Sequence, residues 1–299
     1  MTSPITFCIS CCNNLNYLKL AVHSVRKYSH FKDSPFIVFA ENCDEDETDE
    51  WLKENEKKYN LEITIGHVPE SGTQGIGGGM NVCAARVKTE FIMFLHADMF
   101  VSKDWDLEAL KIFDKYPNEK LWVSSQRFQP NLFKEESRPG TLVFPYETFG
   151  YKYDDFDEQY FIEYAAEFSR LNPNCEYEKG EGVSGLIRTK DFLEIGGNDS
   201  RYSPAYAEDL DLFLRMQLAG YRFILTTNSI IFHFGSRSDK SNFPDDEIKR
   251  SDRSKLYEQR SITRFIEKWG FPPTHHNKDG FITFPPNVDK KSLKHLIKI

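Results

Sequence analysis

Acidic and imidazole side chains occur at four places in this sequence where an apolar segment ends or begins. Asp98 follows residues 91–96, and Glu41 and His233 follow two further apolar runs. The pair Glu208–Asp209 opens another apolar segment. Carboxylates and imidazoles that meet can hold a divalent cation, and an ionised carboxylate can take a proton from a hydroxyl group. These residue types therefore suggest a metal site and a general base, if the fold brings them together.

Each of these residues also has an ordinary structural interpretation. A single acid at the end of a strand is usually a loop residue, and Asp209 alone would suit the N-terminus of a helix. However, three acids, Glu208, Asp209 and Asp211, fall in the first turn of one predicted helix, which is more than capping requires. Close to Asp98 they would repel one another unless a cation or a substrate joined them.

The segment after His233 adds a basic residue. A lone histidine at the end of a strand is usually structural, but here the sequence Ser236-Arg237-Ser238 follows within a few residues. A guanidinium group can bind a phosphate oxygen with two hydrogen bonds. Arg237 is therefore a candidate phosphate contact next to the candidate metal ligand.

The first hundred residues alternate between strand and helix patterns. Strands are predicted from β-branched and aromatic runs, and helices from apolar residues spaced three and four apart. The predicted strands are 5–10, 35–40, 61–68 and 90–98, and the predicted helices are 14–28, 46–59 and 79–88. This alternation predicts a parallel sheet covered by helices.

Ligands of such sheets bind beyond the carboxyl ends of the strands. Asp98 and Glu41 stand at two of these ends, and Ser10 stands at the end of the first strand. The three side chains are therefore expected at one edge of the sheet.

The pattern changes after Asp98. A helix is predicted over 104–115, a strand over 120–128, a helix over 207–221 that ends at Gly220, and a strand over 222–234. Residues 130–180 are aromatic and acidic with weak periodicity, which suggests a lid or an acceptor-side insertion. The tail from residue 240 is polar.

Composition limits the function classes. A chain of 299 residues with 39% hydrophobic content can bury a large core, and a net charge of -8 disfavours binding through a nucleic-acid backbone. No apolar run is long enough for a membrane helix. Without a recognisable signal peptide, the six cysteines are interpreted as reduced thiols of a cytoplasmic protein.

A glycine-rich segment, residues 71–81, lies between a predicted strand and a helix. A dinucleotide fingerprint that starts at Gly75 and Gly77 would require a glycine where Met80 stands, so a nicotinamide site is disfavoured. The segment is expected to be a surface loop or a loop that closes over a bound ligand.

Together these segments resemble the family 2 glycosyltransferases, which have the GT-A fold. The resemblance covers about residues 5–238 and rests on FIMFLHADM, the GVSGLIR and GGND segments, the EDLDLFLR helix and the strand that ends in His233. It implies an α/β fold with a Rossmann-like mixed sheet, mostly parallel and flanked by helices. Residues 1–100 would bind the nucleotide-sugar, 101–240 the acceptor, and 241–299 would form a C-terminal extension.

The resemblance also implies roles for single residues. Asp98 would bind the metal ion, Mn²⁺ or Mg²⁺, that bridges the diphosphate of the donor, and His233 would be a further ligand. Glu41 would contact the ribose or the base near Ser10, and Asp209 would be the general base. Arg215 is expected to form a structural ion pair on its helix.

One position departs from the family pattern. His96 occupies the place of the first acid of the metal motif, so the ribose contact there would come from a neutral imidazole while Asp98 keeps the metal. The implied activity is transfer from a nucleoside-diphosphate sugar, with a UDP-sugar favoured, to an acceptor hydroxyl group. A single base opposite the leaving group favours inversion, because no second carboxylate is placed as a nucleophile.

Alternatives stay open at this point. A sugar nucleotidyltransferase would share the scaffold and the metal, but usually carries a glycine-rich loop with a lysine after the first strand, where this chain has SCCNNLNYL. A non-catalytic sugar-binding relative is the third class. The acceptor could be a glycan, a protein side chain or a modified nucleobase in DNA.

Overall fold

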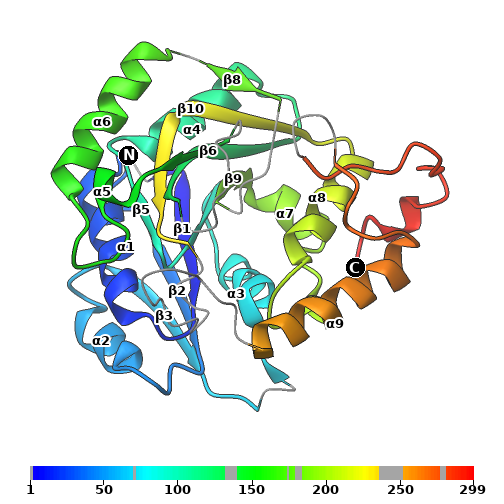
Figure 1. The fold of residues 1–299 in the computed structure, drawn as a ribbon, viewed down its shortest axis with the longest axis horizontal. Helices are drawn as coiled ribbons and strands as arrows, with labels where there is room; N and C mark the ends of the chain where they lie inside the picture. The colour runs from blue at the N-terminus through cyan, green and yellow to red at the C-terminus, as the bar shows by residue number, and fades with distance from the viewer. Residues whose placement is uncertain are drawn as a thin grey trace.

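The computed structural model describes residues 3–69, 72–131, 140–173, 175–178, 184–235, 252–276 and 281–299. Its first part confirms the predicted alternation of strands and helices (Figure 1). The elements are β1 (Ile5–Cys11), α1 (Leu15–Tyr28), β2 (Phe36–Glu41), α2 (Thr48–Asn55), β3 (Leu61–Gly66), α3 (Gly75–Ala84) and β4 (Phe91–His96). Strands β2 and β4 pair with β1, and β3 pairs with β2, all in parallel.

The second part of the chain continues the same sheet. It contributes β5 (Met99–Val101), α4 (Trp105–Lys115), β6 (Leu121–Pro130), β7 (Thr141–Phe144), α5 (Tyr146–Phe149), α6 (Glu158–Leu171), β8 (Glu176–Tyr177), β9 (Gly185–Arg188), α7 (Thr189–Glu194), η2 (Ser200–Tyr202), α8 (Glu208–Leu218), β10 (Arg222–His233), α9 (Asp252–Trp269) and η3 (Lys294–Leu296). The strand order is β3-β2-β1-β4-β9-β6-β10-β5, with β7 beside β6 and β8 beside β10.

The sheet is mixed because β9 runs antiparallel to both of its neighbours, β4 and β6. Strand β10 is parallel to β6, and the short β5 pairs antiparallel with β10. This confirms the predicted α/β class with a mixed, mostly parallel sheet.

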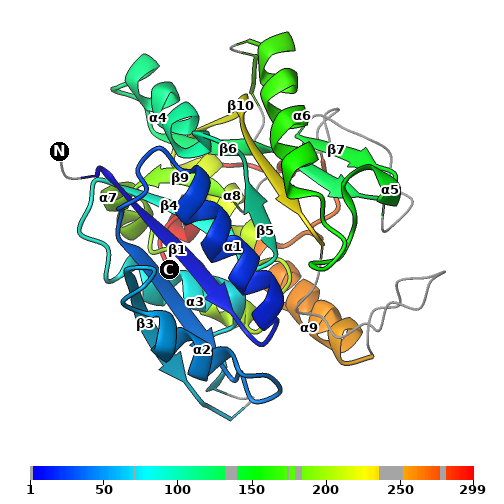
Figure 2. The same cartoon turned by 90° about the vertical axis from the view of Figure 1, so that its left-hand side faces the viewer.

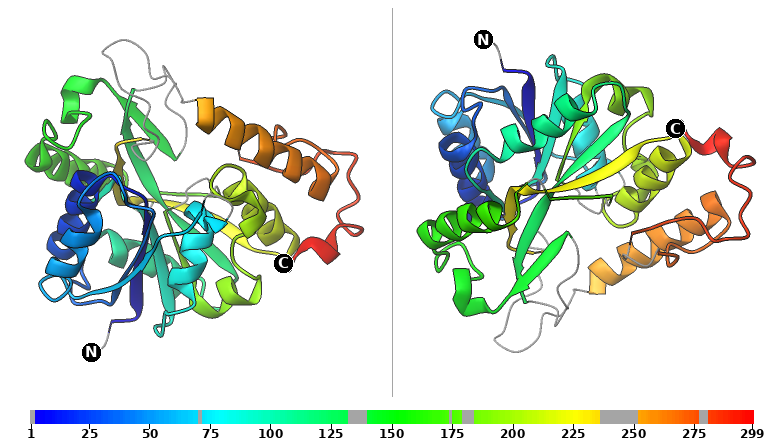
Figure 3. Two further views of the ribbon diagram at one scale, coloured as in Figure 1. Left: turned by 90° about the horizontal axis from the view of Figure 1, so that it is seen from below. Right: turned by 90° about the horizontal axis from the view of Figure 1, so that it is seen from above.

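Helices cover both faces of the sheet (Figure 3). One apolar cluster joins the strands to α1, α2 and α4, and includes Leu18, Leu52 and Trp105. A second cluster joins the other face to α3, α7, α8 and α9, and includes Phe213 and Phe265. Burying each such side chain stabilises the fold by about 1.5–3 kcal/mol.

A third cluster lies around α5 and α6, in the region where the sequence predicted an insertion. Phenylalanines of β6, β10 and α6 pack there with their rings mostly edge to face, and α6 lies beside β10 (Figure 2). The segment 140–173 is therefore a folded part of the core. Residues 132–139 of the predicted lid or insertion lie outside the described residues.

The predicted start of one helix was wrong, and two helices were not predicted. Helix α3 begins at Gly75, not at residue 79, so residues 75–79 are helical and not a loop. The backbone amides of Gln74 and Gly75 donate to the two carboxylate oxygens of Glu41, which satisfies the start of this helix. Helices α6 and α9 were not predicted, because α6 lies in the aromatic and acidic stretch of weak periodicity and α9 lies in the polar tail.

Among the described residues, none of the helices has both the length and the hydropathy that a bilayer-spanning segment requires.

Candidate active site

His96, Asp98 and His233 meet at one edge of the sheet. His96 is the last residue of β4, Asp98 lies in the turn into β5, and His233 is the last residue of β10. The register pairs His233 with Met99, and the amide of Phe234 donates to the Asp98 carbonyl at 3.0 Å. This short antiparallel pairing between β5 and β10 fixes the turn that contains Asp98 next to the end of β10.

The three side chains have the geometry of a metal site. Their ligand atoms lie within 4.8 Å of one another, and Nε2 of His233 is 3.5 Å from Oδ2 of Asp98. His96 Nε2 and His233 Nδ1 are buried and have no hydrogen-bond partner within the described ranges. Burial, the largest effect, lowers the pKa of His96 to about 4, so its imidazole is neutral at neutral pH. Two imidazoles and a carboxylate are ligand types that fit a divalent cation.

Ser10 lies beside this group. In the register between β1 and β4, Ser10 is paired with His96. A Cβ at Gly79 would lie 2.1 Å from the Ser10 hydroxyl oxygen, so only glycine lets α3 approach the strand this closely. The structure thus brings Ser10 to the edge where the sequence placed it.

Glu208 and Asp209 form the first turn of α8 and line a small hollow. The hollow is lined by Ile76, Met80, Trp122, Asn198, Glu208, Asp209, Leu212 and Phe213. A Cβ at Gly77 would lie 3.1 Å from Cγ of Glu208. Because Gly79 of the same helix touches Ser10, α3 packs between the α8 acids and the strand-end edge.

The two acids lie in a strongly desolvating environment. Burial, and then the charge of Asp209, raises the pKa of Glu208 to about 8. Its Oε2 atom has no hydrogen-bond partner in the described part of the chain. Burial also raises the pKa of Asp209, although the Leu210 amide at 2.8 Å and the charge of Arg127 oppose this effect. The pair therefore combines a protonated and a more readily ionised carboxyl group.

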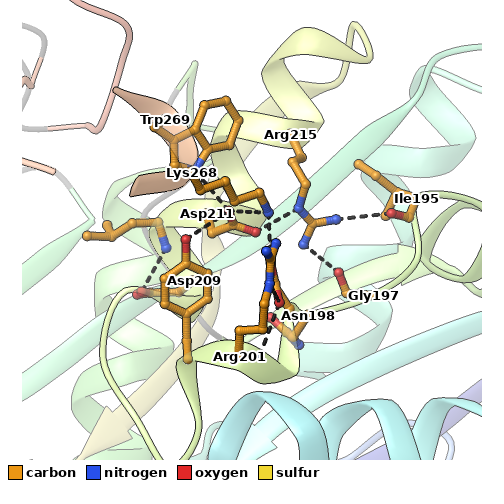
Figure 4. A network of polar contacts seen from close by, with 12 residues as sticks. Ile195, Gly197, Asn198, Arg201, Asp209, Asp211, Arg215, Lys268 and Trp269 are labelled. Atoms are coloured by element: carbon orange, nitrogen blue, oxygen red, sulfur yellow. Dashed lines mark hydrogen bonds and ion pairs between the residues drawn. The ribbon is translucent and has the colours of Figure 1, made fainter. Parts of the chain in front are cut away.

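A buried ion pair fixes the helix that carries these acids. Nε of Arg215 donates to Oδ2 of Asp211 at 2.7 Å, and both side chains are fully buried. Arg215 also donates to the carbonyls of Ile195 and Gly197 (Figure 4). The predicted structural ion pair of Arg215 is confirmed. Asp211, one of the three acids that the sequence grouped together, belongs to this pair and does not line the hollow.

Glu41 is present at the sheet edge but its carboxylate is already bonded. Its two oxygens accept hydrogen bonds of 2.9 and 3.0 Å from the amides of Gln74 and Gly75. The predicted contact of Glu41 with a ribose or a base therefore stays a prediction. Arg237 lies outside the described residues.

Arg127 on β6 is a residue that the sequence analysis missed. Its charge disfavours protonation of both His96 and Asp209, so it lies near both parts of the site. Its guanidinium donates to Thr141 Oγ1 at 3.0 and 2.8 Å. The available signal was an arginine inside the otherwise uncharged strand segment VSSQRF.

Residues 6–171 match the family model described as glycosyl transferase family 2. TarS of Staphylococcus aureus, a poly(ribitol-phosphate) beta-N-acetylglucosaminyltransferase, is 23% identical over 136 residues, which cover 44% of this chain and 23% of TarS. The rhamnosyltransferase WbbL of Escherichia coli K12 is 25% identical over 188 residues, which cover 58% of this chain and 65% of WbbL. The matched region thus spans less than two thirds of either relative.

Solved structures share the fold. The crystal structure of S. aureus TarS gives a TM-score of 0.51 at 16% identity, covering 78% of this chain and 36% of that one. GalNAc-T7 with UDP, GalNAc and Mn²⁺ gives 0.59 at 15% identity, covering 89% and 48%. TarS 1-349 in complex with UDP gives 0.52 at 13% identity, covering 92% and 74%. These likenesses confirm the expected GT-A fold.

Proposed function

Because the chain belongs to glycosyl transferase family 2, we propose that it transfers a sugar from a nucleoside-diphosphate sugar, with a UDP-sugar as the favoured donor, to a hydroxyl group of an acceptor. The observation that carries this proposal is the meeting of His96, Asp98 and His233 at the edge of the sheet, with Arg127 near both His96 and Asp209. The UDP present in two of the similar structures supports the choice of nucleotide.

In this proposal, Asp98 and His233 hold a divalent ion, Mn²⁺ or Mg²⁺, with His96 beside them. The Mn²⁺ in the GalNAc-T7 structure supports such a requirement. When bound, the ion would neutralise the negative charge that grows on the diphosphate leaving group. Ser10 and Glu41 contribute to the ribose and base side of the donor, and Arg237 contributes a phosphate contact.

Asp209 acts as the general base. Apolar side chains line most of its hollow, and the positive charge of Arg127 favours its ionised form. The carboxylate takes the proton of the acceptor hydroxyl as the new bond forms. With one base on the face opposite the leaving group, the reaction inverts the configuration at the sugar carbon. Glu208, protonated at neutral pH, donates a hydrogen bond to a substrate oxygen.

The proposal also assigns donor binding and acceptor binding to different parts of the domain. Residues 1–100 bind the donor and residues 101–240 bind the acceptor, with 241–299 as an extension. The acceptor could be a glycan, a protein side chain or a modified nucleobase in DNA. A cytoplasmic location stays a prediction.

Donor hydrolysis tests the proposal directly. Purified protein is incubated with a panel of UDP-sugars, with and without Mn²⁺, and released UDP is measured. We expect hydrolysis of at least one UDP-sugar that depends on the metal, and loss of both hydrolysis and metal-dependent UDP binding in Asp98→Ala. The matched control is Asp104→Ala, an acid at the start of α4 that lies away from the sheet edge.

Two results would contradict the assignment. If Asp98→Ala folds and still binds UDP with unchanged Mn²⁺ dependence, Asp98 is not a metal ligand. If no nucleotide-sugar is hydrolysed or bound by the folded wild-type protein, the transferase proposal itself is wrong.

A further inference from the structure

A basic hollow lies between η2 and α9, away from the strand-end metal group. It encloses about 400 Å³ and is lined by Arg201, Tyr202, Arg264, Glu267 and Lys268. Three of the five lining side chains are cationic, in a chain whose net charge is -8. The overall composition is acidic, so this concentration of positive charge is a local property of the surface around the hollow.

The cations of the hollow are held in place by a buried acid. Asp199, whose side chain is 1% exposed, accepts from Nε of Arg201 at 2.9 Å and from Nζ of Lys268 at 2.9 Å. Lys268 also lies 2.7 Å from Oδ1 of Asp211 (Figure 4). The side chains of Arg201 and Lys268 are therefore already ordered, and they would lose little conformational entropy on binding a ligand.

The charges around the hollow do not cancel. The cationic groups of this network and its rim are Arg201, Arg215, Arg264 and Lys268, and the acidic groups are Asp199, Asp211 and Glu267. Arg260 stands one helical turn before Arg264 and donates to the carbonyl of Ser203, which adds a further positive charge at the same edge. The two central acids are paired with cations on two sides, and Glu267 is exposed to water. An anion entering the hollow therefore meets a positive local charge.

Arg264 has hydrogen-bonding capacity left for a ligand. Within the part of the chain that the structure describes, it donates Nη1 to the backbone carbonyl of Arg201. A guanidinium group has five N–H donors in a planar fork. The ammonium group of Lys268 likewise has three donors for its two carboxylate contacts. These groups can offer a forked arginine contact and a point charge to one tetrahedral oxyanion.

We propose that the hollow formed by Arg201, Arg264 and Lys268 binds a phosphate group, either a free phosphate ion or a phosphate ester carried by a larger substrate. The residues that follow η2 connect it to the candidate active site, because the Ile76 amide at the start of α3 donates to the Pro204 carbonyl at 3.0 Å.

Calorimetric titration with inorganic phosphate tests the site. The wild-type protein is expected to bind phosphate, and Arg264→Gln is expected to bind it about tenfold more weakly, since one charge-assisted contact is lost. Arg264→Lys, which keeps the charge but loses the fork, is expected to fall between the two. The control is Arg170→Gln on α6, an exposed arginine paired with Glu167, for which the affinity should stay unchanged.

A second titration distinguishes the two sources of phosphate. A short glycerol-phosphate oligomer that binds more tightly than inorganic phosphate, and loses that advantage in Arg264→Gln, indicates a phosphate ester carried by a larger substrate. Equal affinities indicate a free phosphate ion.

The proposal is overturned if folded wild-type protein binds neither probe. It is also overturned if phosphate binds but Arg264→Gln, with an unchanged melting temperature, binds it as tightly as the wild type. Neither outcome depends on the glycosyl transfer reaction, so the phosphate site and the proposed function can fail separately.

Discussion

Glu208 and Asp209 are neighbours in the chain, but Glu208 is expected to be protonated near neutral pH. Burial raises the pKa of Glu208 to about 8, with the charge of Asp209 as the second cause. The amide of Leu210 and the charge of Arg127 support the ionised form of Asp209. This difference supports the proposal that Asp209, and not Glu208, is the general base.

Asp209→Asn keeps the shape of the side chain and removes the proposed base. We expect turnover with an acceptor to fall by about a hundredfold or more, the usual scale for loss of a general base. Affinity for UDP and Mn²⁺ should stay within a few-fold, because the carboxylate does not belong to the metal group. Steady-state kinetics and UDP titration measure the two effects. Near-normal turnover would assign the base to another residue, with Glu208 as the next candidate.

Glu208 should also make the stability of the protein depend on pH. Its pKa is about 8 in the folded chain against an ordinary value of 4.5, so the folded state binds this proton more tightly than the unfolded state does. The stabilisation is fully present below pH 4.5 and is lost as pH rises through 8.

Glu208→Gln removes this titration. Between pH 5 and pH 8.5 we expect the melting temperature of the wild type to fall by about 3 °C or more relative to that of the variant. Thermal unfolding of both proteins across this range measures the difference. Parallel curves would show that Glu208 does not titrate abnormally. Glu163→Gln, an exposed acid on α6, serves as the control.

Several site residues could be predicted from the sequence because they stand at the ends of strongly patterned segments. Asp98 follows one apolar strand and His233 ends another, so the topology places them at one edge, and Asp209 opens an amphipathic helix. Arg127 could not be predicted as readily, since its role depends on which strands are neighbours in the sheet. The capping of α3 by Glu41 also depends on a contact between distant segments.

At the scale of elements, α3 shows how tertiary contacts can stabilise a helix whose residues have low intrinsic helix propensity. Its first half is rich in glycine, the poorest helix former after proline, and the sequence therefore predicted a loop. The helix forms because Glu41 caps it and because glycines at 77 and 79 allow close packing against Glu208 and Ser10. Helices α6 and α9 were not predicted from the sequence. Only a few of the described residues of each helix are buried against the rest of the protein, so few positions in these segments mark a core-facing side.

Gly75 allows a quantitative test of this packing. Its φ is +65°, and a Cβ there would lie 2.0 Å from the carbonyl oxygen of Pro204. We expect Gly75→Ala to lower the free energy of unfolding by about 3 kcal/mol, combining left-handed strain and steric overlap. Gly220 has a φ of +80° with nothing within 4 Å of the added Cβ.

Gly220→Ala is the matched control, because it isolates the strain from the overlap. Its expected cost is about 1 kcal/mol. Urea unfolding of the two variants measures both costs. Similar losses for the two variants would mean that α3 can shift away from Pro204 without penalty.

At the scale of the whole molecule, the two predicted halves are parts of one sheet. Strand β9 lies between β4 of the first half and β6 of the second, although it follows both in the chain. His233 and Asp209 come later in the chain than residue 171, where the family match ends. The site is therefore complete only when the whole sheet has formed, which explains why no single segment of the sequence contains it.

The C-terminal extension is integral to this arrangement. Phe265 and Trp269 of α9 are buried in the cluster that also contains Phe213 of α8. The indole N–H of Trp269 donates to Oδ1 of Asp211 at 2.9 Å (Figure 4). In the sequence this region resembles a polar tail, because its buried positions, 261, 265 and 269, include a serine and are spaced four apart among charged residues.

Phe265 allows the contribution of the extension to be measured in the full-length protein. Phe265→Ala removes a side chain with no exposed surface and leaves a cavity under α9, so we expect the free energy of unfolding to fall by about 3–5 kcal/mol. Leu256→Ala on the same helix removes a side chain that is 61% exposed, and its effect should stay within about 0.5 kcal/mol. Alanine favours the helix in both variants, so the difference reports the packing of α9 against α8. If both variants are as stable as the wild type in urea unfolding, the packing of α9 does not contribute to the stability of the core.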